Sequence, residues 1–236
     1  MTGSGSAGDG RVVVVTGANR GIGLELVRRL ALRGDTVVLG CRDLRRGEEA
    51  ARSLSGRVLV RRLDVTDTVD TTGLETELRA EYGRLDVLVN NAGPQLDTWQ
   101  RAADADLSSV CAALDVNILG AWELCQRMLG LLRTSGRGRI VNVSSGEGSL
   151  TNMGGGIPAY RLGKAGLNVL TRMLAAELRA DGVLVNSVCP GWVATDPDGA
   201  GGRPIADGAR SVLWAVDLPD SGPTGGFFRD GRPLPW

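Results

Sequence analysis

The sequence predicts a single-domain α/β protein built on a doubly wound parallel sheet of about seven strands, with helices on both faces. Short aliphatic runs rich in valine alternate with longer segments in which apolar residues recur every three or four positions, the period of an amphipathic helix. Continuous aliphatic runs fit strands that are buried on both faces, and their alternation with helices favours right-handed crossovers. With 236 residues, 42% of them hydrophobic, the chain is long enough for one substantial core.

Each predicted strand is a short aliphatic run bounded by polar or glycine-containing segments. In chain order the strands are predicted at residues 12–15, 36–40, 57–63, 85–90, 139–144, 183–188 and, more weakly, 225–228. Helices are expected between them, as the spacing of Leu74, Leu78 and Tyr82 indicates. Residues 1–10 are predicted to be a flexible lead-in, because Gly and Ser without apolar partners do not offset the entropy of ordering. Residues 11–236 are then the domain.

Charge and composition exclude several classes of function. Lys+Arg and Asp+Glu are equal at 27 each, so we expect no nucleic-acid or membrane partner. The chain has no histidine and no C-x-x-C pair among Cys41, Cys111, Cys125 and Cys189, which excludes histidine-based triads and predicts no metal site. It also has no apolar run of about 18 residues and no signal-peptide pattern. We therefore predict a cytoplasmic protein with free thiols.

The first predicted strand runs into the glycine-rich turn TGANRGIG, residues 16–23, which precedes a helix. Gly17 permits a tight turn, while Gly21 and Gly23 lack side chains that would keep a pyrophosphate from the positive end of the helix. Doubly wound sheets bind ligands beyond the carboxyl ends of their strands, where this turn falls. The turn therefore predicts dinucleotide binding. The alternative is a simple strand-to-helix turn, because the spacing is G-x-x-x-G-x-G rather than G-x-G-x-x-G.

Residues near the end of the second predicted strand indicate which dinucleotide binds. An NAD site usually places a carboxylate there for the ribose 2′-hydroxyl, whereas a 2′-phosphate requires arginine. Here Cys41 occupies the position of the acid, Arg42 follows it, and Arg20 lies in the glycine turn. These residues favour NADPH over NADH, although Asp43 is close enough to leave NADH as the alternative.

Tyr160 and Lys164 stand four residues apart in a helical pattern, so their side chains share a face. Lys164 is the only lysine of the chain. A phenol with its ordinary pKa near 10 transfers protons poorly at neutral pH unless a cation stabilises the phenolate, and a compact ammonium does this while also reaching a ribose. The pair therefore predicts acid–base chemistry. The alternative is a packing tyrosine beside a surface lysine.

Other polar residues follow the predicted strands at the same edge of the sheet. Ser144 and Ser145 lie at the end of the strand predicted at 139–144. The motif NNAG, residues 90–93, lies at the end of the strand predicted at 85–90, and Asn117 lies in the helix that precedes the strand at 139–144. Together with TGANRGIG, Y-x-x-x-K and CPGWVAT, these motifs make the chain, from about residue 11 to its end, resemble the short-chain dehydrogenase/reductase family. The resemblance implies a Rossmann-type sheet in the order 3-2-1-4-5-6-7 and an NAD(P)-dependent oxidoreductase.

The resemblance also implies roles for individual residues. The resemblance implies that Tyr160 is the general acid in reduction and that Lys164 lowers the pKa of Tyr160 and holds the nicotinamide ribose. It also implies that Ser145 orients the substrate carbonyl and that Asn117 anchors a water of the proton relay. Cofactor contacts are implied for Gly17, Asn19, Arg20, Gly21, Ile22, Gly23, Arg42, Asp64, Val65, Asn90, Tyr160, Lys164, Val193 and Thr195.

The ending GPTGGFFRDGRPLPW makes the carbonyl-reductase-like branch of the family the best match. That branch implies NADPH and a small ketone, aldehyde or alcohol substrate. A non-catalytic NAD(P)-binding sensor or assembly protein of the same fold is the alternative. The family often pairs helices equivalent to residues 107–132 and 159–180, so a homo-oligomer, a dimer or a tetramer, is expected, with a monomer as the alternative.

Departures from the family pattern concern the substrate side. Gly163 replaces the usual serine before the lysine and is expected to loosen the start of the helix. The loop between Ser145 and Tyr160 is rich in glycine, and the substrate loop at about 192–204 is short. Segments that contain Trp99, Leu150, Met153 and Trp192 are expected to border an apolar pocket, and Glu147 to contact either a polar substrate group or water.

Overall fold

The computed structural model describes residues 10–93, 96–193 and 201–236. Its strands form one sheet in the order β3-β2-β1-β4-β5-β6-β7-β8, which confirms the predicted α/β class and the predicted order of the first seven strands. Neighbours from β3 to β7 are parallel, and the short β8 pairs antiparallel with β7. Most of the predicted lead-in, residues 1–9, lies outside the described residues.

The predicted strands all form, with ends that lie within two residues of the expected ones. Their bounds are β1 (Val12–Thr16), β2 (Thr36–Cys41), β3 (Arg57–Arg62), β4 (Val87–Asn90), β5 (Arg139–Val143), β6 (Leu184–Val188) and β7 (Phe227–Arg229). The sequence analysis missed β8 (Arg232–Pro233), a two-residue strand after a turn at Asp230 and Gly231. Its pairing with β7 closes that edge of the sheet.

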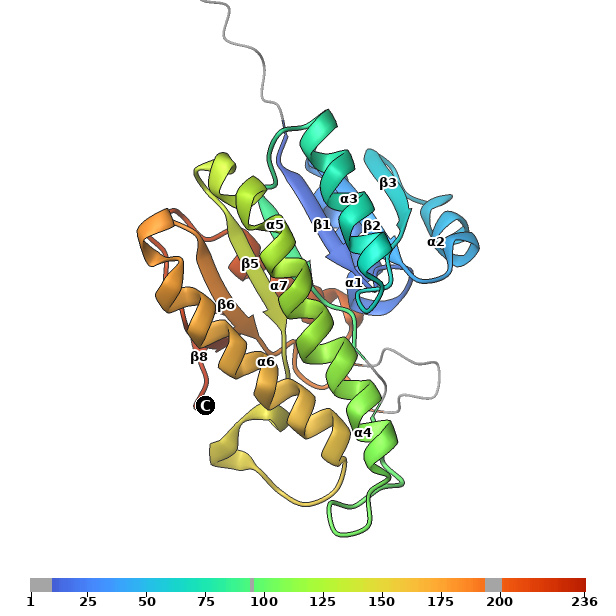
Figure 1. Ribbon diagram of the computed structural model, residues 1–236, viewed down its shortest axis with the longest axis vertical. Coiled ribbons are helices and arrows are strands. Elements are labelled where there is room, and N and C mark those ends of the chain that lie inside the picture. Colours follow the sequence, from blue (N-terminus) through green and yellow to red (C-terminus); the bar gives the residue numbers. More distant parts are fainter. Residues whose placement is uncertain (1–9, 94–95, 194–200) are drawn as a thin grey trace, which may run out of the picture.

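Helices cover both faces of the sheet (Figure 1). One layer contains α3 (Thr68–Glu81), α4 (Leu107–Leu114), α5 (Ala121–Ser135) and α6 (Pro158–Glu177). The other contains α1 (Gly21–Leu32), α2 (Leu44–Ala51) and α7 (Ile205–Val216). Strand residues alternate between the two layers, because successive side chains of a strand point to opposite faces. Val12 and Val14 lie in the core under α3, α5 and α6, while Val13 and Val15 lie in the core under α1 and α7.

The helix predicted at residues 107–132 forms, but it is not uniform. Between α4 and α5 the residues Asp115–Gly120 adopt a π-helical turn, labelled η1. The helical stretch Leu107–Ser135 contains an 18-residue window with a mean hydropathy of 1.3, long and apolar enough by composition for a membrane span, which the sequence analysis did not identify. A helix that packs on a core passes the same test, and Leu124, Met128 and Leu132 are buried in this core.

Helix pairing between copies of the chain stays a prediction. Apolar side chains are exposed on the two elements expected to pair: Leu119 of η1 and Leu162 and Val169 of α6 are each more than half exposed.

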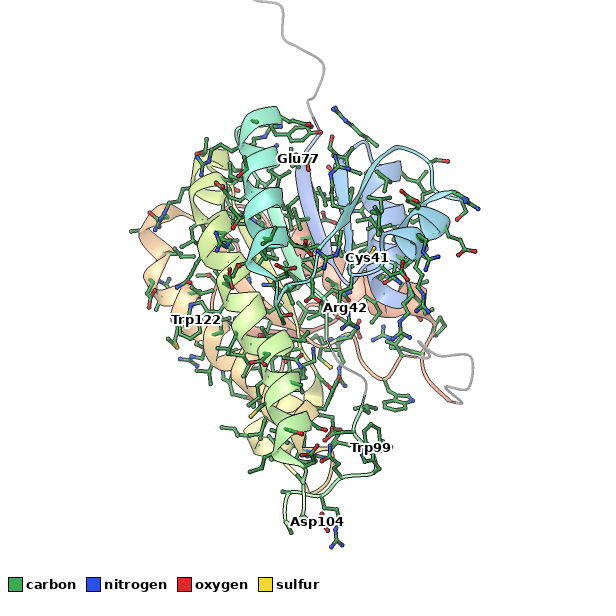
Figure 2. All side chains as sticks on the ribbon, turned by 45° about the vertical axis from the view of Figure 1, so that its right-hand side comes forward. Cys41, Arg42, Glu77, Trp99, Asp104 and Trp122 are labelled. Atoms are coloured by element: carbon green, nitrogen blue, oxygen red, sulfur yellow. The ribbon has the colours of Figure 1, made fainter. Side chains whose placement is uncertain are left out.

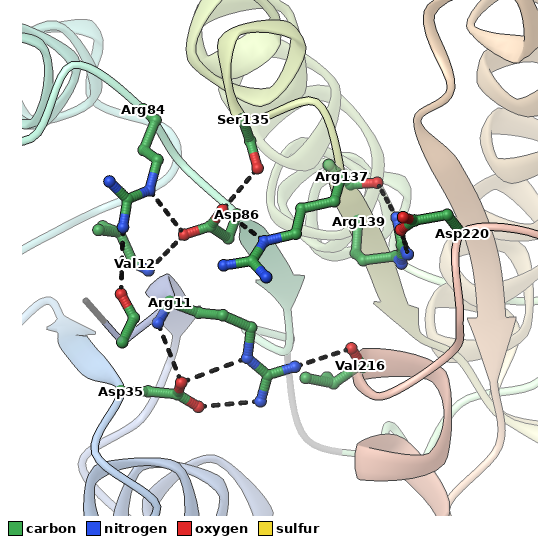
Figure 3. Close-up of polar contacts among 12 residues, drawn as sticks. Arg11, Val12, Asp35, Arg84, Asp86, Ser135, Arg137, Arg139, Val216 and Asp220 are labelled. Carbon is green, nitrogen blue, oxygen red and sulfur yellow. Dashed lines mark hydrogen bonds and ion pairs between the residues drawn. The ribbon is translucent and has the colours of Figure 1, made fainter. Parts of the chain in front are cut away.

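The two edges of the sheet carry different groups. At the carboxyl edge the chain extends well beyond the strands, and Trp99 and Asp104 lie in this extension (Figure 2). At the amino edge, charged residues beside the strand starts pair with one another (Figure 3). Arg11 pairs with Asp35 at 2.9 Å, Arg84 with Asp86 at 3.2 Å, and Arg139 with Asp220.

Candidate active site

Four polar residues gather beyond the carboxyl ends of β4 and β5. Ser145 follows β5, Tyr160 and Lys164 lie in the first turns of α6, and Asn117 lies in η1. Helix α6 packs against both η1 and the strands β5 and β6, and this packing brings the four residues together. The structure therefore groups all the residues predicted to be catalytic.

The side chain of Ser145 faces the hydroxyl of Tyr160 and favours its ionised form as a hydrogen-bond donor. Ser145 Oγ also accepts a hydrogen bond from the backbone N–H of Glu147 at 3.2 Å, which fixes its position after the strand. Burial raises the pKa of Tyr160 above its ordinary value, and the hydrogen bond from Ser145 opposes this shift only in part. The expected lowering of this pKa by Lys164 is not found, because burial outweighs the favourable contacts.

Lys164 is buried beneath the tyrosine, with a side chain only 5% exposed. Its Nζ lies 5.7 Å from the centre of the Tyr160 ring and donates a hydrogen bond to the carbonyl of Val143 at 2.9 Å. Burial lowers the pKa of Lys164 to about 8. The only lysine of the chain thus titrates close to neutral pH, so it is not the surface lysine of the alternative interpretation.

Asn117 approaches the lysine from the other side of Gly93. A Cβ atom placed on Gly93 would lie 3.2 Å from both Asn117 Oδ1 and Lys164 Nζ. Asn117 Nδ2 donates to the carbonyl of Ala113 at 3.0 Å, whereas Oδ1 is buried and has no partner among the described residues. π-Helical turns are rare and frequent at functional sites. A buried amide oxygen beside an ammonium has the chemistry needed to hold a water.

Gly163 was expected to loosen the start of α6, which stays a prediction, and the structure shows a second consequence of the glycine. A Cβ at this position would lie 2.8 Å from Nδ2 and 3.0 Å from Cβ of Asn117. The missing side chain is therefore required for the close approach of α6 to η1. Serine at this position would displace Asn117.

The glycine turn has the geometry of a tight strand-to-helix connection. Gly17 and Gly21 have φ values of 61° and 56°, in the left-handed region that favours glycine. Helix α1 begins at Gly21, so its free N–H groups and positive dipole end lie at this turn. Such a helix terminus fits a pyrophosphate.

Gly23 also has a role within the fold, beside the predicted cofactor contact. A Cβ there would lie 2.6 Å from Nδ2 of Asn91. That amide donates to the carbonyls of Thr16 and Gly17 at 2.8 and 3.1 Å, and so holds the turn against β4. The sequence analysis missed Asn91, although it is the second residue of the NNAG motif.

The remaining turn residues point in different directions. Asn19 is partly exposed and Arg20, the residue before α1, is exposed. Ile22 packs toward α7, where a Cβ on Gly208 would contact both Ile22 and Val193. Val193 forms an isolated parallel bridge with Arg203. Thr195 and residues 194–200 of the substrate loop lie outside the described residues.

The end of β2 presents arginine rather than a carboxylate. Cys41 is buried and faces α2, and Arg42 is exposed beside it (Figure 2). Asp43 is occupied elsewhere, because its carboxylate caps α2 by accepting from the N–H of Arg46 at 3.3 Å. One oxygen of the Asp43 carboxylate therefore has a partner inside the chain.

Three of the residues with implied cofactor contacts lie at the ends of β3 and β4. Burial alone would raise the pKa of Asp64, but hydrogen bonds from Thr66 and the charge of Arg42 hold it below its ordinary value. The side chain of Val65 is buried in the core. Asn90 is also buried, with Nδ2 donating to Asn142 Oδ1 at 2.8 Å, because strand alternation turns it toward α5. The side chains of Val65 and Asn90 thus pack inside the fold, although Asn90 Oδ1 has no partner among the described residues.

The residues expected to border the pocket are mostly exposed. Trp99 is 75% exposed, Leu150 is 71% exposed and Trp192 is 63% exposed. Glu147 pairs with Arg161 at 2.6 Å, a contact that was not predicted. This ion pair joins the segment after Ser145 to the first turn of α6.

Comparison with known proteins agrees with this geometry. Residues 11–201 match the family model for short chain dehydrogenase. Carbonyl reductase [NADPH] 1 of Sus scrofa is 34% identical over 280 aligned residues, which cover 96% of this chain and 94% of the relative. Salutaridine reductase of Papaver bracteatum is 31% identical, with 92% and 94% covered.

Solved structures give the same result. The NADPH-bound carbonyl reductase from chicken fatty liver has a TM-score of 0.83 at 26% identity, covering 96% of this chain and 99% of that one. Carbonyl reductase Sniffer of D. melanogaster has a TM-score of 0.85 at 28% identity, with the same coverage. The Sus scrofa alignment is longer than this 236-residue chain, so that relative carries insertions.

Proposed function

Because the chain belongs to the short-chain dehydrogenase/reductase family, we propose that it is an NADPH-dependent carbonyl reductase in which Tyr160 is the general acid. The observation that carries the proposal is that the hydroxyls of Ser145 and Tyr160 face one another, with Lys164 Nζ 5.7 Å from the centre of the phenol ring. Two hydroxyl groups that meet at the ligand-binding edge of the sheet form a site for one carbonyl oxygen.

Each residue of the candidate site has its own role in the proposed reduction of a carbonyl group. When bound, NADPH supplies the hydride that the carbonyl carbon accepts. Ser145 donates a hydrogen bond to the carbonyl oxygen and orients it, and Tyr160 donates the proton that completes the alcohol. The phenol then has to recover a proton. Lys164, with a pKa lowered to about 8, holds one that is readily released, and Asn117 Oδ1 offers an acceptor for a water that reaches the lysine.

The described residues fit the cofactor named in this proposal. The left-handed glycines and the start of α1 suit the pyrophosphate, and the strand-end residue Arg42 suits a 2′-phosphate. Thr66 holds the Asp64 carboxylate by two hydrogen bonds, at 3.0 and 2.7 Å, in a position beside the adenine side. Lys164 is the candidate for the nicotinamide ribose and Val193 for the nicotinamide carboxamide, while Thr195, the candidate for the pyrophosphate side, lies outside the described residues.

Oxidation of NADPH and NADH, measured side by side with a panel of ketones, aldehydes and quinones, tests the proposal. We expect NADPH to be oxidised much faster, and Tyr160→Phe to lose at least about 100-fold in kcat because the proton donor is gone. Tyr82→Phe is the matched control, since Tyr82 is the only other tyrosine and lies at the end of α3.

The possible results test the cofactor preference, the phenol mechanism and the catalytic role separately. Faster oxidation of NADH would contradict the role of Arg42 and leave the acid–base residues untouched. Equal rates for Tyr160→Phe and the parent protein would contradict the phenol mechanism. Binding of both cofactors without turnover of any panel member would support the non-catalytic alternative.

A further inference from the structure

Helix α6, which carries Tyr160 and Lys164, begins without a cap from its own sequence. The residue before it, Ile157, has φ 43° and ψ 50°, and its side chain makes no cap hydrogen bond. A left-handed conformation is strained for a β-branched residue. The first turn of a helix has N–H groups without partners inside the helix, so a helix start with this geometry depends on an outside acceptor.

That acceptor is the side chain of Asp97, which lies more than sixty residues earlier in the chain. Its two carboxylate oxygens accept from the N–H of Ala159 at 2.9 Å and from the N–H of Tyr160 at 3.1 Å. One of the two bonds is therefore made to the backbone of the tyrosine itself.

The carboxylate of Asp97 is costly to bury, because the residue is only 4% exposed. Within the described ranges no arginine or lysine forms an ion pair with it. The two N–H groups and the positive end of the α6 dipole are what compensate its charge. Such an arrangement ties the two segments firmly, since neither side has a replacement partner.

Asp97 is itself held in place within the segment that follows β4. Its carbonyl accepts from the N–H of Gln100 at 3.0 Å, and the buried side chain of Gln100 accepts from the N–H of Asp106, the cap of α4, at 2.8 Å. On the other side of the helix start, Gly154, Gly155 and Gly156 precede Ile157, and a Cβ on Gly155 or Gly156 would contact nothing within 4 Å. The glycine segment offers no rigid support, so Asp97 provides it.

We propose that Asp97 is a positioning residue that fixes the first turn of α6 and thereby the place of the Tyr160 hydroxyl relative to Ser145. The inference rests on the proposed function for its effect on rate, but its effect on the position of Tyr160 is independent of that function. A displaced catalytic group reduces the rate without preventing cofactor binding. Asp97 acts through the backbone of Tyr160 and not by contact with the reacting atoms.

The test uses the full chain with Asp97→Asn and, as a harsher change, Asp97→Ala. An asparagine keeps one oxygen but turns an NH₂ group toward the second N–H, so one cap bond is lost. We expect kcat to fall about 10- to 100-fold, with the KM for NADPH changed by less than about threefold. Asp106→Asn is the matched control, because Asp106 also accepts from two backbone N–H groups at a helix start but is exposed and caps α4. It should keep the parent kcat.

A second readout does not depend on turnover. The chain has two tyrosines, so labelling with 3-fluorotyrosine gives one fluorine resonance for Tyr160 and one for Tyr82. Asp97→Asn should shift and broaden the Tyr160 resonance and leave that of Tyr82 unchanged. An unchanged Tyr160 resonance, or an equal loss of kcat in Asp106→Asn, would overturn the proposal. A displaced resonance in a protein that reduces no substrate would support the positioning role and count against the proposed function alone.

Discussion

Asp86 and Asn117 are both 1% exposed, but they lie at opposite edges of the sheet and differ in their partners. Asp86, at the amino edge, accepts from the N–H of Val12 at 2.7 Å, from the hydroxyl of Ser135 and from Arg84 and Arg137 (Figure 3). Asn117, at the carboxyl edge, donates to one carbonyl, and its Oδ1 has no partner among the described residues.

The same difference holds for the other buried polar atoms of the described residues. Those without a partner all belong to side chains at or beside the carboxyl edge: Oδ1 of Asn90, Asn117 and Asn168, and Nε of Arg161 and Arg229. An unsatisfied buried group costs about 1–3 kcal/mol, and proteins tend to accept such costs at functional sites. The buried polar groups compared at the amino edge therefore stabilise the fold, whereas the unpartnered polar atoms at the carboxyl edge lower its stability at the candidate active site.

The largest expected effect on stability comes from breaking the amino edge with Asp86→Asn. The free energy of unfolding should fall by about 3 kcal/mol, because Arg84 and the N–H of Val12 lose a buried charged acceptor. The kcat of the folded protein should not change, since the site lies at the other edge. Urea unfolding at pH 7 and steady-state rates measure the two quantities.

The pH dependence of this effect has a definite sign. Burial alone would raise the pKa of Asp86, but hydrogen bonds from Ser135, Val12 and Arg84 outweigh it and lower that pKa. The stabilisation is thus present above the unfolded pKa, about 3.9, and lost as the pH falls through the folded value. The gap between Asp86→Asn and the parent should narrow below about pH 4. Asp220→Asn, whose carboxylate is 75% exposed, is the control and should cost less than about 1 kcal/mol.

At the carboxyl edge, Lys164→Met should have the opposite effect on stability. The pKa of Lys164 is lowered from 10.5 to about 8 because burial disfavours the ammonium, so its removal should raise the free energy of unfolding at pH 7 by about 1–3 kcal/mol. Activity should fall at least about 100-fold, because the phenol loses the group proposed to return its proton. A loss of stability in Lys164→Met would contradict the comparison between the two edges.

The difference in unfolding free energy between the parent and Lys164→Met should also depend on pH. Between the folded pKa, about 8, and the unfolded value of 10.5, the unfolded state binds more protons, so the stability of the parent rises with pH in this window. The difference between parent and Lys164→Met should therefore shrink from pH 7 to pH 9.5. Guanidinium unfolding at both values measures it, and nitrogen-15 labelling of the single lysine gives its pKa from one resonance.

Local patterns were sufficient for the strands and for the positions of Ser145, Tyr160 and Lys164. The valine runs determine strands that are buried on both faces, and motifs next to strand ends fall at the carboxyl edge of a parallel sheet. Contacts between distant segments leave no such pattern. Nothing near Ile157 indicates that its helix is capped by Asp97, and nothing near Asn90 indicates that it bonds with Asn142. The close approach of Gly163 to Asn117 was not predicted for the same reason, because the two residues are distant in sequence.

The smallest expected effect compares two helical glycines, Gly163 in α6 and Gly73 in α3. Alanine is favoured over glycine inside a helix by about 1 kcal/mol. A Cβ on Gly73 would contact nothing within 4 Å, so Gly73→Ala should raise the free energy of unfolding by about 0.5–1 kcal/mol. A Cβ on Gly163 would displace Asn117, so Gly163→Ala should lower it by about 1 kcal/mol and reduce kcat. Thermal unfolding of both variants under one condition measures the difference. If both variants are stabilised, α6 and η1 have room to separate, and the close approach of Gly163 to Asn117 is not a requirement of the site.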